Sequence, residues 1–126
     1  MEQLTNHDDN MANTKKILLE HLRKKGYISN IKLAEEETAF EKVSLKKASD
    51  LFVRDAITGL GKILKEDLDN HYYITTVKVG TINSVLTYAI ILRHDDSATI
   101  YVYAHEGLVK RKLAQKTIER IKSVLV

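Results

Sequence analysis

Three consecutive runs of strand-favouring residues stand in the C-terminal half of the chain, separated by short polar segments. The runs cover residues 72–80, 85–93 and 98–104. Each is rich in Val, Ile, Thr and Tyr, which favour strands. The segments between them, residues 80–84 and 95–97, carry Gly, Asn, Asp and Ser and are short enough for hairpins. The pattern predicts an antiparallel meander, and a periodic run at residues 108–125 predicts a closing helix.

The three predicted strands differ in how apolar they are. Residues 85–93 are apolar on both faces, as expected for a central strand that is covered on two sides. Residues 72–80 contain Thr75, Thr76 and Lys78, and this more polar composition is typical of a strand at the edge of a sheet. We therefore expect residues 72–80 to form an edge strand.

The N-terminal part of the chain predicts a tail and a helix. Residues 1–12 are polar and lack periodicity, so we expect a flexible tail followed by a single domain over residues 13–126. Asn13 or Thr14 can cap the first helix. Its apolar stripe contains Ile17, Leu18 and Leu22, and Gly26 is placed to end it.

Residues 27–44 fit two interpretations. The first is a pair of short strands at residues 27–33 and 38–43, joined by an acidic turn at residues 34–37. The second is a helix that begins at Ser29 or Asn30, which propensity favours because Glu and Ala are poor strand residues. The sequence leaves both interpretations open.

The longest predicted helix covers residues 45–68 and has Ser44 as its cap. Its apolar stripe is broader than one buried face requires, and Gly59 and Gly61 lie within it. The glycines indicate either a frayed or kinked helix end, or the close approach of another backbone around Ala56 and Gly59.

Composition excludes several classes of function. The chain has 126 residues and no Cys, which rules out disulfides, thiol nucleophiles and thiolate metal sites. No apolar run approaches the roughly 20 residues of a membrane span and no signal peptide is recognisable, so a cytoplasmic protein is expected. The five histidines lack metal-ligand spacing, and the glycines at 59 and 61 lack the rest of a dinucleotide motif. We predict no catalytic, metal-binding or cofactor-binding residues, and no enzyme.

The last predicted helix has a basic face. The residues on this face that we consider for docking are Lys110, Arg111, Lys116 and Arg120. Such a face is often simply solvated, and cations near a helix C-terminus are electrostatically favourable. Its functional interpretation is a docking surface for an acidic protein, an anionic membrane surface or nucleic acid.

With two strands in residues 27–44, the order of elements is helix, strand, strand, long helix, three strands, helix. This order resembles the roadblock/LC7 family over residues 13–126, and the best local match is HEGLVKRKLAQKTIERIKSVL at residues 105–125. The resemblance implies an α+β domain with a five-stranded antiparallel sheet, the long helix on one face and the two terminal helices on the other.

The resemblance also implies a function. Family members are dimers, formed with themselves or a paralogue, that act as non-enzymatic scaffolds or regulators of small Ras-like GTPases or as light chains of larger complexes. Carried over to this chain, the dimer interface comprises Tyr73, Thr75, Val77 and Val79 of the predicted edge strand and Ser49, Val53, Ala56 and Gly59 of the long helix.

The alternative is a winged-helix DNA-binding regulator. Residues 17–36 look like a first helix, a glycine turn and a second helix, and residues from Ser44 onward would then supply the recognition helix. That helix is mostly apolar, and Leu51, Phe52 and Ile57 cannot contact base edges or phosphates. The sequence therefore does not favour nucleic acid as a partner.

Overall fold

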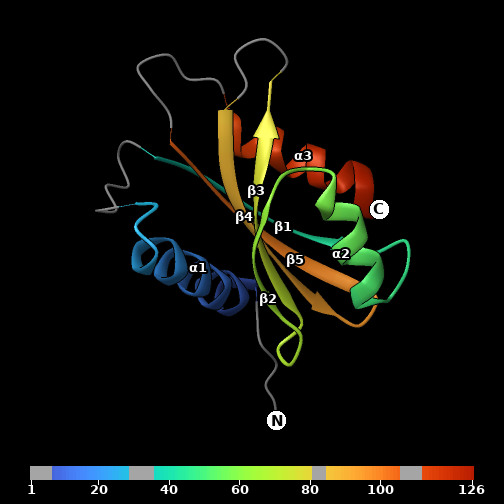
Figure 1. Ribbon diagram of the computed structural model, residues 1–126. Coiled ribbons are helices and arrows are strands. Elements are labelled where there is room, and N and C mark those ends of the chain that lie inside the picture. The colour runs from blue at the N-terminus through green and yellow to red at the C-terminus, as the bar shows by residue number, and fades with distance from the viewer. Residues whose placement is uncertain (1–6, 29–35, 81–84, 106–111) are drawn as a thin grey trace.

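A computed structural model of the chain describes residues 7–28, 36–80, 85–105 and 112–126. Within these residues, three helices and five strands form one α+β arrangement (Figure 1). In chain order the elements are α1 (His7–Lys24), β1 (Glu36–Ser44), α2 (Asp50–Thr58), β2 (Ile63–Asp67), β3 (Tyr72–Val79), β4 (Val85–His94), β5 (Ser97–His105) and α3 (Leu113–Leu125).

The strands form a single antiparallel sheet in the order β1-β5-β4-β3-β2. The predicted meander is confirmed as β3, β4 and β5, and β4 is the central strand of the sheet. Successive β4 residues point to opposite sides, so that Ile90 belongs to one core cluster and Ile91 to the other. β4 is therefore apolar on both faces because each face contributes to a core cluster, as the sequence predicted.

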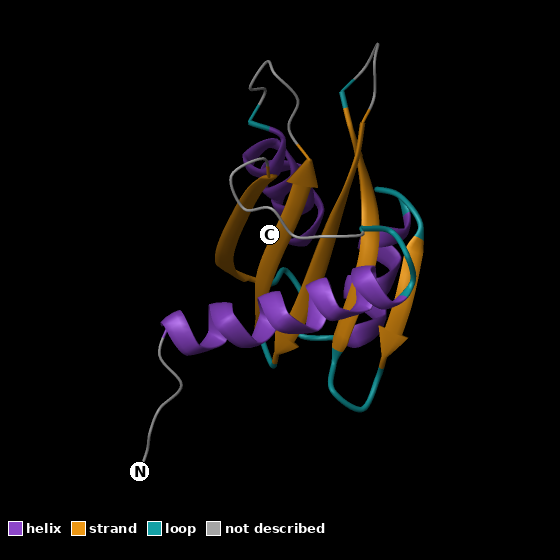
Figure 2. Cartoon of the chain, turned by 90° about the vertical axis from the view of Figure 1, so that its left-hand side faces the viewer, coloured by secondary structure: helices purple, strands orange, loops and turns teal. Residues whose placement is uncertain are grey.

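Helices cover both faces of the sheet, but not in the expected pairing. Figure 2 shows α1 crossing one face, with α2 and α3 behind the sheet. Leu18 and Leu22 of α1 pack on one side, whereas Ile57 of α2 and Ile121 of α3 share the core on the other. The expectation that the terminal helices share a face is wrong. The physical reason is the length of α2: nine residues rise by only about 14 Å, which leaves room on that face for α3.

The segment predicted as one long helix is a helix followed by a strand. Ser44 ends β1, and the actual cap of α2 is Ser49, whose hydroxyl accepts a hydrogen bond from the backbone N–H of Phe52 at 3.3 Å. After Thr58 the chain turns and pairs with β3. The N–H of Lys62 donates to the hydroxyl of Thr76 at 2.8 Å, and the N–H of Thr76 donates to the carbonyl of Lys62 at 2.9 Å. These contacts to a strand replace helical hydrogen bonds.

β2 changes the position of β3 in the sheet. Because β3 pairs with β2 on one side and β4 on the other, the prediction that residues 72–80 form an edge is wrong. The edge is β2 itself, a short strand with an irregular register and the charged residues Lys65, Glu66 and Asp67. A short, irregular and charged strand is a common protection of a sheet edge against pairing with other chains.

The ambiguous segment at residues 27–44 contains a strand. β1 confirms the strand predicted at residues 38–43 and excludes a helix that continues to Glu41. The strand predicted at residues 27–33 lies mostly outside the described residues. Since α1 is followed by β1 and then by the nine-residue α2, the helix order that a winged-helix domain would require is not found in the described chain.

Two helix boundaries differ from the sequence prediction. α1 begins at His7, so residues 7–12, expected in the tail, are helical. Its predicted end is confirmed, because Gly26 follows the helix with a positive φ of 80° that glycine adopts without strain. α3 begins at Leu113; residues 108–111 of the predicted closing helix lie outside the described residues.

Candidate functional site

The four residues predicted to pair two chains through a strand are buried inside the monomer. Tyr73, Thr75 and Val77 have no exposed surface and Val79 is nearly buried. Their strand, β3, already has two hydrogen-bonded neighbours. Consequently β3 has no open edge for a second chain, although dimerisation itself stays a prediction.

The four residues predicted on the helix have three different environments. Val53 is fully buried in the core beneath α2. Ser49 and Ala56 line an open groove beside α2. A side chain at Gly59 would meet open space, so this glycine does not mark a close approach of backbones. Gly61 does, because a Cβ there would overlap the carbonyl group of Thr76.

The groove lies between α2 and the end of α3 and has a volume of about 560 Å³. Its lining residues are Lys46, Lys47, Ser49, Leu51, Phe52, Asp55, Ala56, Ser123 and Val124. Leu51 is the most exposed of its apolar residues, with 65% of its surface accessible. Of the apolar stripe predicted from the sequence, Leu51 thus remains at the surface, whereas Val53 and Ile57 are buried in the core.

A basic cleft of about 400 Å³ lies at the other end of α2. It is lined by Thr58, Gly59, Leu60, Gly61, Lys62, Thr76, Lys78, Leu86 and Arg120. Lys62 precedes β2, Lys78 belongs to β3 and Arg120 to α3, so three separate segments each supply a cation. None of the three forms an ion pair with a described residue, and the lining contains no acidic side chain.

We refer to this groove and basic cleft together as the α2–α3 face. Two sets of predicted residues meet here: Ser49, Ala56 and Gly59 from the expected dimer interface, and Arg120 from the expected docking surface. Lys116 is exposed on α3, whereas Lys110 and Arg111 lie outside the described residues. No local pattern in the sequence predicts that Lys62 and Lys78 join Arg120, because their approach depends on β2 pairing with β3.

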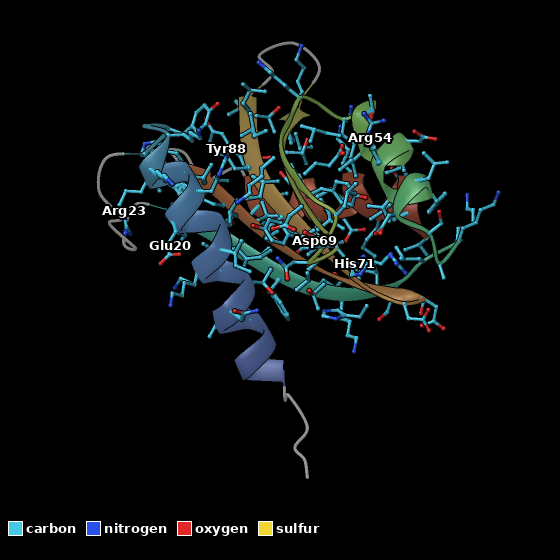
Figure 3. All side chains as sticks on the ribbon, turned by 60° about the horizontal axis from the view of Figure 1, so that its bottom comes forward. Glu20, Arg23, Arg54, Asp69, His71 and Tyr88 are labelled. Carbon is cyan, nitrogen blue, oxygen red and sulfur yellow. The ribbon has the colours of Figure 1, made fainter. Side chains whose placement is uncertain are left out.

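A charged cluster fixes the beginning of α2 against the sheet. Arg93 donates from Nε to one carboxylate oxygen of Asp50 at 2.8 Å, and Nδ1 of His71 lies 2.8 Å from the other. The hydroxyl of Tyr73 donates to the backbone carbonyl of Asp50 at 3.1 Å. His71 lies beside the turn that carries Asp69, as Figure 3 shows. This cluster ties α2 to β3 and β4 and so positions the α2–α3 face.

The electrostatics of the cluster follow from these contacts. The hydrogen bond from Arg93 lowers the pKa of Asp50 below its ordinary value, and the contact with His71 acts in the same direction. Burial, together with the nearby charge of Asp50, raises the pKa of Tyr73 to about 12. Asp50 is thus held as a carboxylate and Tyr73 as a neutral hydroxyl at neutral pH.

Comparisons with known proteins add no relatives: no family model, curated protein or solved structure matches the chain. The described helices include none that is long and apolar enough to cross a membrane. Likewise, the described residues contain no group of three or more His, Asp or Glu side chains arranged to hold a metal ion.

Proposed function

We propose that this chain is a non-enzymatic scaffold or regulator that binds an acidic, amphipathic protein segment on its α2–α3 face. The observation that carries the proposal is the combination of exposed Leu51 in an apolar groove with three cations, free of described ion pairs, in the adjoining basic cleft. Apolar grooves between helices are common binding sites for amphipathic helices.

The two parts of the face suit different parts of such a partner. An apolar anchor fits the groove beside Leu51 and Phe52, where burial of apolar surface would supply affinity. Carboxylates of the partner would pair with Lys62, Lys78 and Arg120. Charges at the rim of an interface mainly accelerate association and select against wrong partners.

A second copy of the chain is a poorer fit for this face. The residues lining the groove and the cleft include one acid, Asp55, against five cations: Lys46, Lys47, Lys62, Lys78 and Arg120. In a twofold dimer the same surface meets itself, so most of these cations would face each other without compensation. A different, acidic protein is therefore the favoured partner.

The roadblock resemblance supports a small Ras-like GTPase as the first partner to titrate. The described order of elements is helix, strand, helix, four strands, helix, which differs from the family order and adds no support. The expected partner is therefore defined by its acidic, amphipathic chemistry. A small GTPase is one class of protein with which binding to the α2–α3 face can be tested.

Leu51→Asp is expected to weaken partner binding by at least about tenfold, because a charge replaces the most exposed apolar side chain that lines the groove. Leu68→Asp is the matched control, since Leu68 is similarly exposed, at 57%, but lies in the turn between β2 and β3. Both variants should unfold at nearly the wild-type denaturant concentration, because neither side chain is in the core.

Because the chain contains no Cys, a single introduced cysteine can carry a crosslinker that captures the partner. The affinity of the captured protein is then measured. A photo-crosslinker attached to a single cysteine at position 51 or 68 is irradiated in an extract of the source cells. A protein captured only at position 51 is purified and titrated by calorimetry with the wild type and both aspartate variants. Equal capture at the two positions, or equal affinity of the two variants, contradicts the proposal.

Replacing both Lys62 and Arg120 with glutamine is expected to slow association with the same partner and to reduce its dependence on salt. Lys15→Gln with Lys16→Gln removes the same charge from α1 on the opposite side of the sheet and is the control. Stopped-flow association rates at several ionic strengths distinguish the two. Identical salt dependence in both double variants would exclude the basic cleft from the interface.

A further inference from the structure

A second basic cleft lies on the opposite side of the sheet, between α1 and β2, and encloses about 510 Å³. Its lining residues are Ile17, Glu20, His21, Lys24, Lys25, Leu64, Lys65 and Tyr72. Figure 3 shows Glu20 and Arg23 on α1, on the other side of the view from Arg54 on α2. We refer to this site as the α1–β2 cleft.

Positive charge converges on the α1–β2 cleft from two elements. Lys24 and Lys25 come from the end of α1 and Lys65 from β2, whereas Glu20 is the only acidic residue in the lining. Within the described chain, none of these lysines forms an ion pair. The ammonium group of Lys65 lies 5.5 Å from the centre of the Tyr72 ring, an interaction that positions it at the cleft.

The imidazole of His21 lies close enough to these lysines for their charge to affect its pKa. Burial lowers the pKa of its imidazole, and Lys65, Lys25 and Lys24 lower it further. The other charged or titratable groups of the lining are Glu20 on its own helix and Tyr72 on β3. The ring therefore lies in a positive field that the described residues around it do not neutralise.

The ordinary explanation for lysines at this position is the helix dipole, which favours cations in the last turn of a helix. That explanation covers Lys24 in the last turn of α1 and Lys25 directly after the helix. It does not cover Lys65, which is on β2 and faces them across the cleft. A hydrogen bond with the Tyr72 hydroxyl and the nearby charge of Asp67 raise the pKa of Lys65, so that its ammonium group is held as a cation at the cleft.

We propose that the α1–β2 cleft binds a small molecule that carries a phosphate group. Lys24, Lys25 and Lys65 hold the phosphate, because ammonium groups form strong charge-assisted hydrogen bonds with its oxygens. Ile17, Leu64 and the Tyr72 ring contact the less polar part of the ligand. The volume is within the range of small-molecule sites. This site lies across the sheet from the α2–α3 face, so either proposal stands if the other fails.

Phenyl phosphate and inorganic phosphate are the probes, because the first adds an apolar group to the second. Each is titrated into ¹⁵N-labelled protein at constant ionic strength. We expect saturable shifts at residues of the α1–β2 cleft at about millimolar concentration or below, with phenyl phosphate the tighter ligand. The imidazole of His21 should titrate at a higher pH in the complex than in the free protein, because the anion offsets the lysines.

Two double variants with the same net charge make the test specific. Lys24→Gln with Lys65→Gln is expected to weaken phenyl phosphate binding by about tenfold and to abolish the change at His21. Lys46→Gln with Lys47→Gln, on the opposite side, should leave both unchanged. Equal loss in the two double variants, or shifts spread over the lysines of both sides, would overturn the proposal.

Free metabolites and lipid headgroups both carry phosphate groups, and a third arm of the experiment separates these two sources. Phosphatidylcholine vesicles with and without phosphatidic acid are sedimented with the protein. Binding to phosphatidic acid that is lost in the Lys24/Lys65 double variant, without binding of phenyl phosphate, assigns the site to a lipid headgroup. Binding of phenyl phosphate without vesicle binding assigns it to a soluble ligand. Binding of neither overturns the proposal.

Discussion

Replacing Gly61 with alanine is expected to lower the free energy of unfolding by about 3 kcal/mol, the upper end of the usual cost of forcing an extra group into a packed site. A Cβ at this position would overlap the carbonyl group of Thr76. The neighbouring backbone cannot retreat easily, because Lys62 and Thr76 are joined by hydrogen bonds in both directions. The substitution should therefore loosen β2 from β3.

Gly59→Ala is the matched control for this prediction. Gly59 has a φ of −78°, which any residue adopts, and open space where a Cβ would be. The alanine should leave the stability unchanged or raise it by about 0.4–1 kcal/mol, because it restricts the unfolded chain. Urea unfolding followed by circular dichroism measures both variants. A similar loss in the two would show that the contact with Thr76 does not limit residue 61.

Asp50→Ala is expected to lower the free energy of unfolding by about 2–3 kcal/mol at pH 7, since it removes two charge-assisted contacts at once. The carboxylate is only 25% exposed, and the side chain of Arg93 is 15% exposed. Removing Asp50 leaves this guanidinium without its carboxylate partner, and among the described residues only its hydrogen bond to the carbonyl of Asp95 remains. The exposed pair of Arg54 and Glu66 is the control, and Glu66→Gln should cost about 0.5 kcal/mol or less.

The effect of Asp50 should depend on pH in one direction. Because the pKa of Asp50 is lower in the folded protein than its ordinary value of 3.8, its stabilisation is fully present above that value. It is lost as the pH falls through the folded pKa, where protonation weakens the contact with Arg93. Wild type and Asp50→Ala should therefore differ clearly at about pH 5 and converge in more acidic solution. A constant difference down to pH 2 would exclude this linkage.

The meander was predictable because its information is local. β3, β4 and β5 are continuous runs rich in Val, Ile, Thr and Tyr, and the turn between β4 and β5 contains Asp95 and Asp96. β2 was not predictable in the same way, since its five residues, Ile-Leu-Lys-Glu-Asp, favour a helix as readily as a strand. Their conformation is decided by pairing with β3, and the close contact at Gly61 permits it.

In the candidate sites, too, some residues are identified by a local pattern and others are brought together only by the pairing of strands. The stripe of α2 and the basic face of α3 are periodic patterns, so Ala56 and Arg120 were identified from the sequence. Lys62 and Lys78 join Arg120, and Lys65 joins Lys24, only because β2 is a strand at the edge of the sheet. Both basic clefts thus depend on one short strand that local propensity does not specify.

The pairing of β1 with β5 has a consequence for how the protein is made. Every residue of β1, the first of the described strands, has its ladder partner in β5, the last of them. On the ribosome, β1 must therefore wait until residues 97–105 have emerged before it acquires this neighbour. Such distant contacts slow folding, because a long loop must close before they form. Synthesis that stops before residue 97 would leave β1 as an unpaired strand, a state that invites aggregation or capture by chaperones.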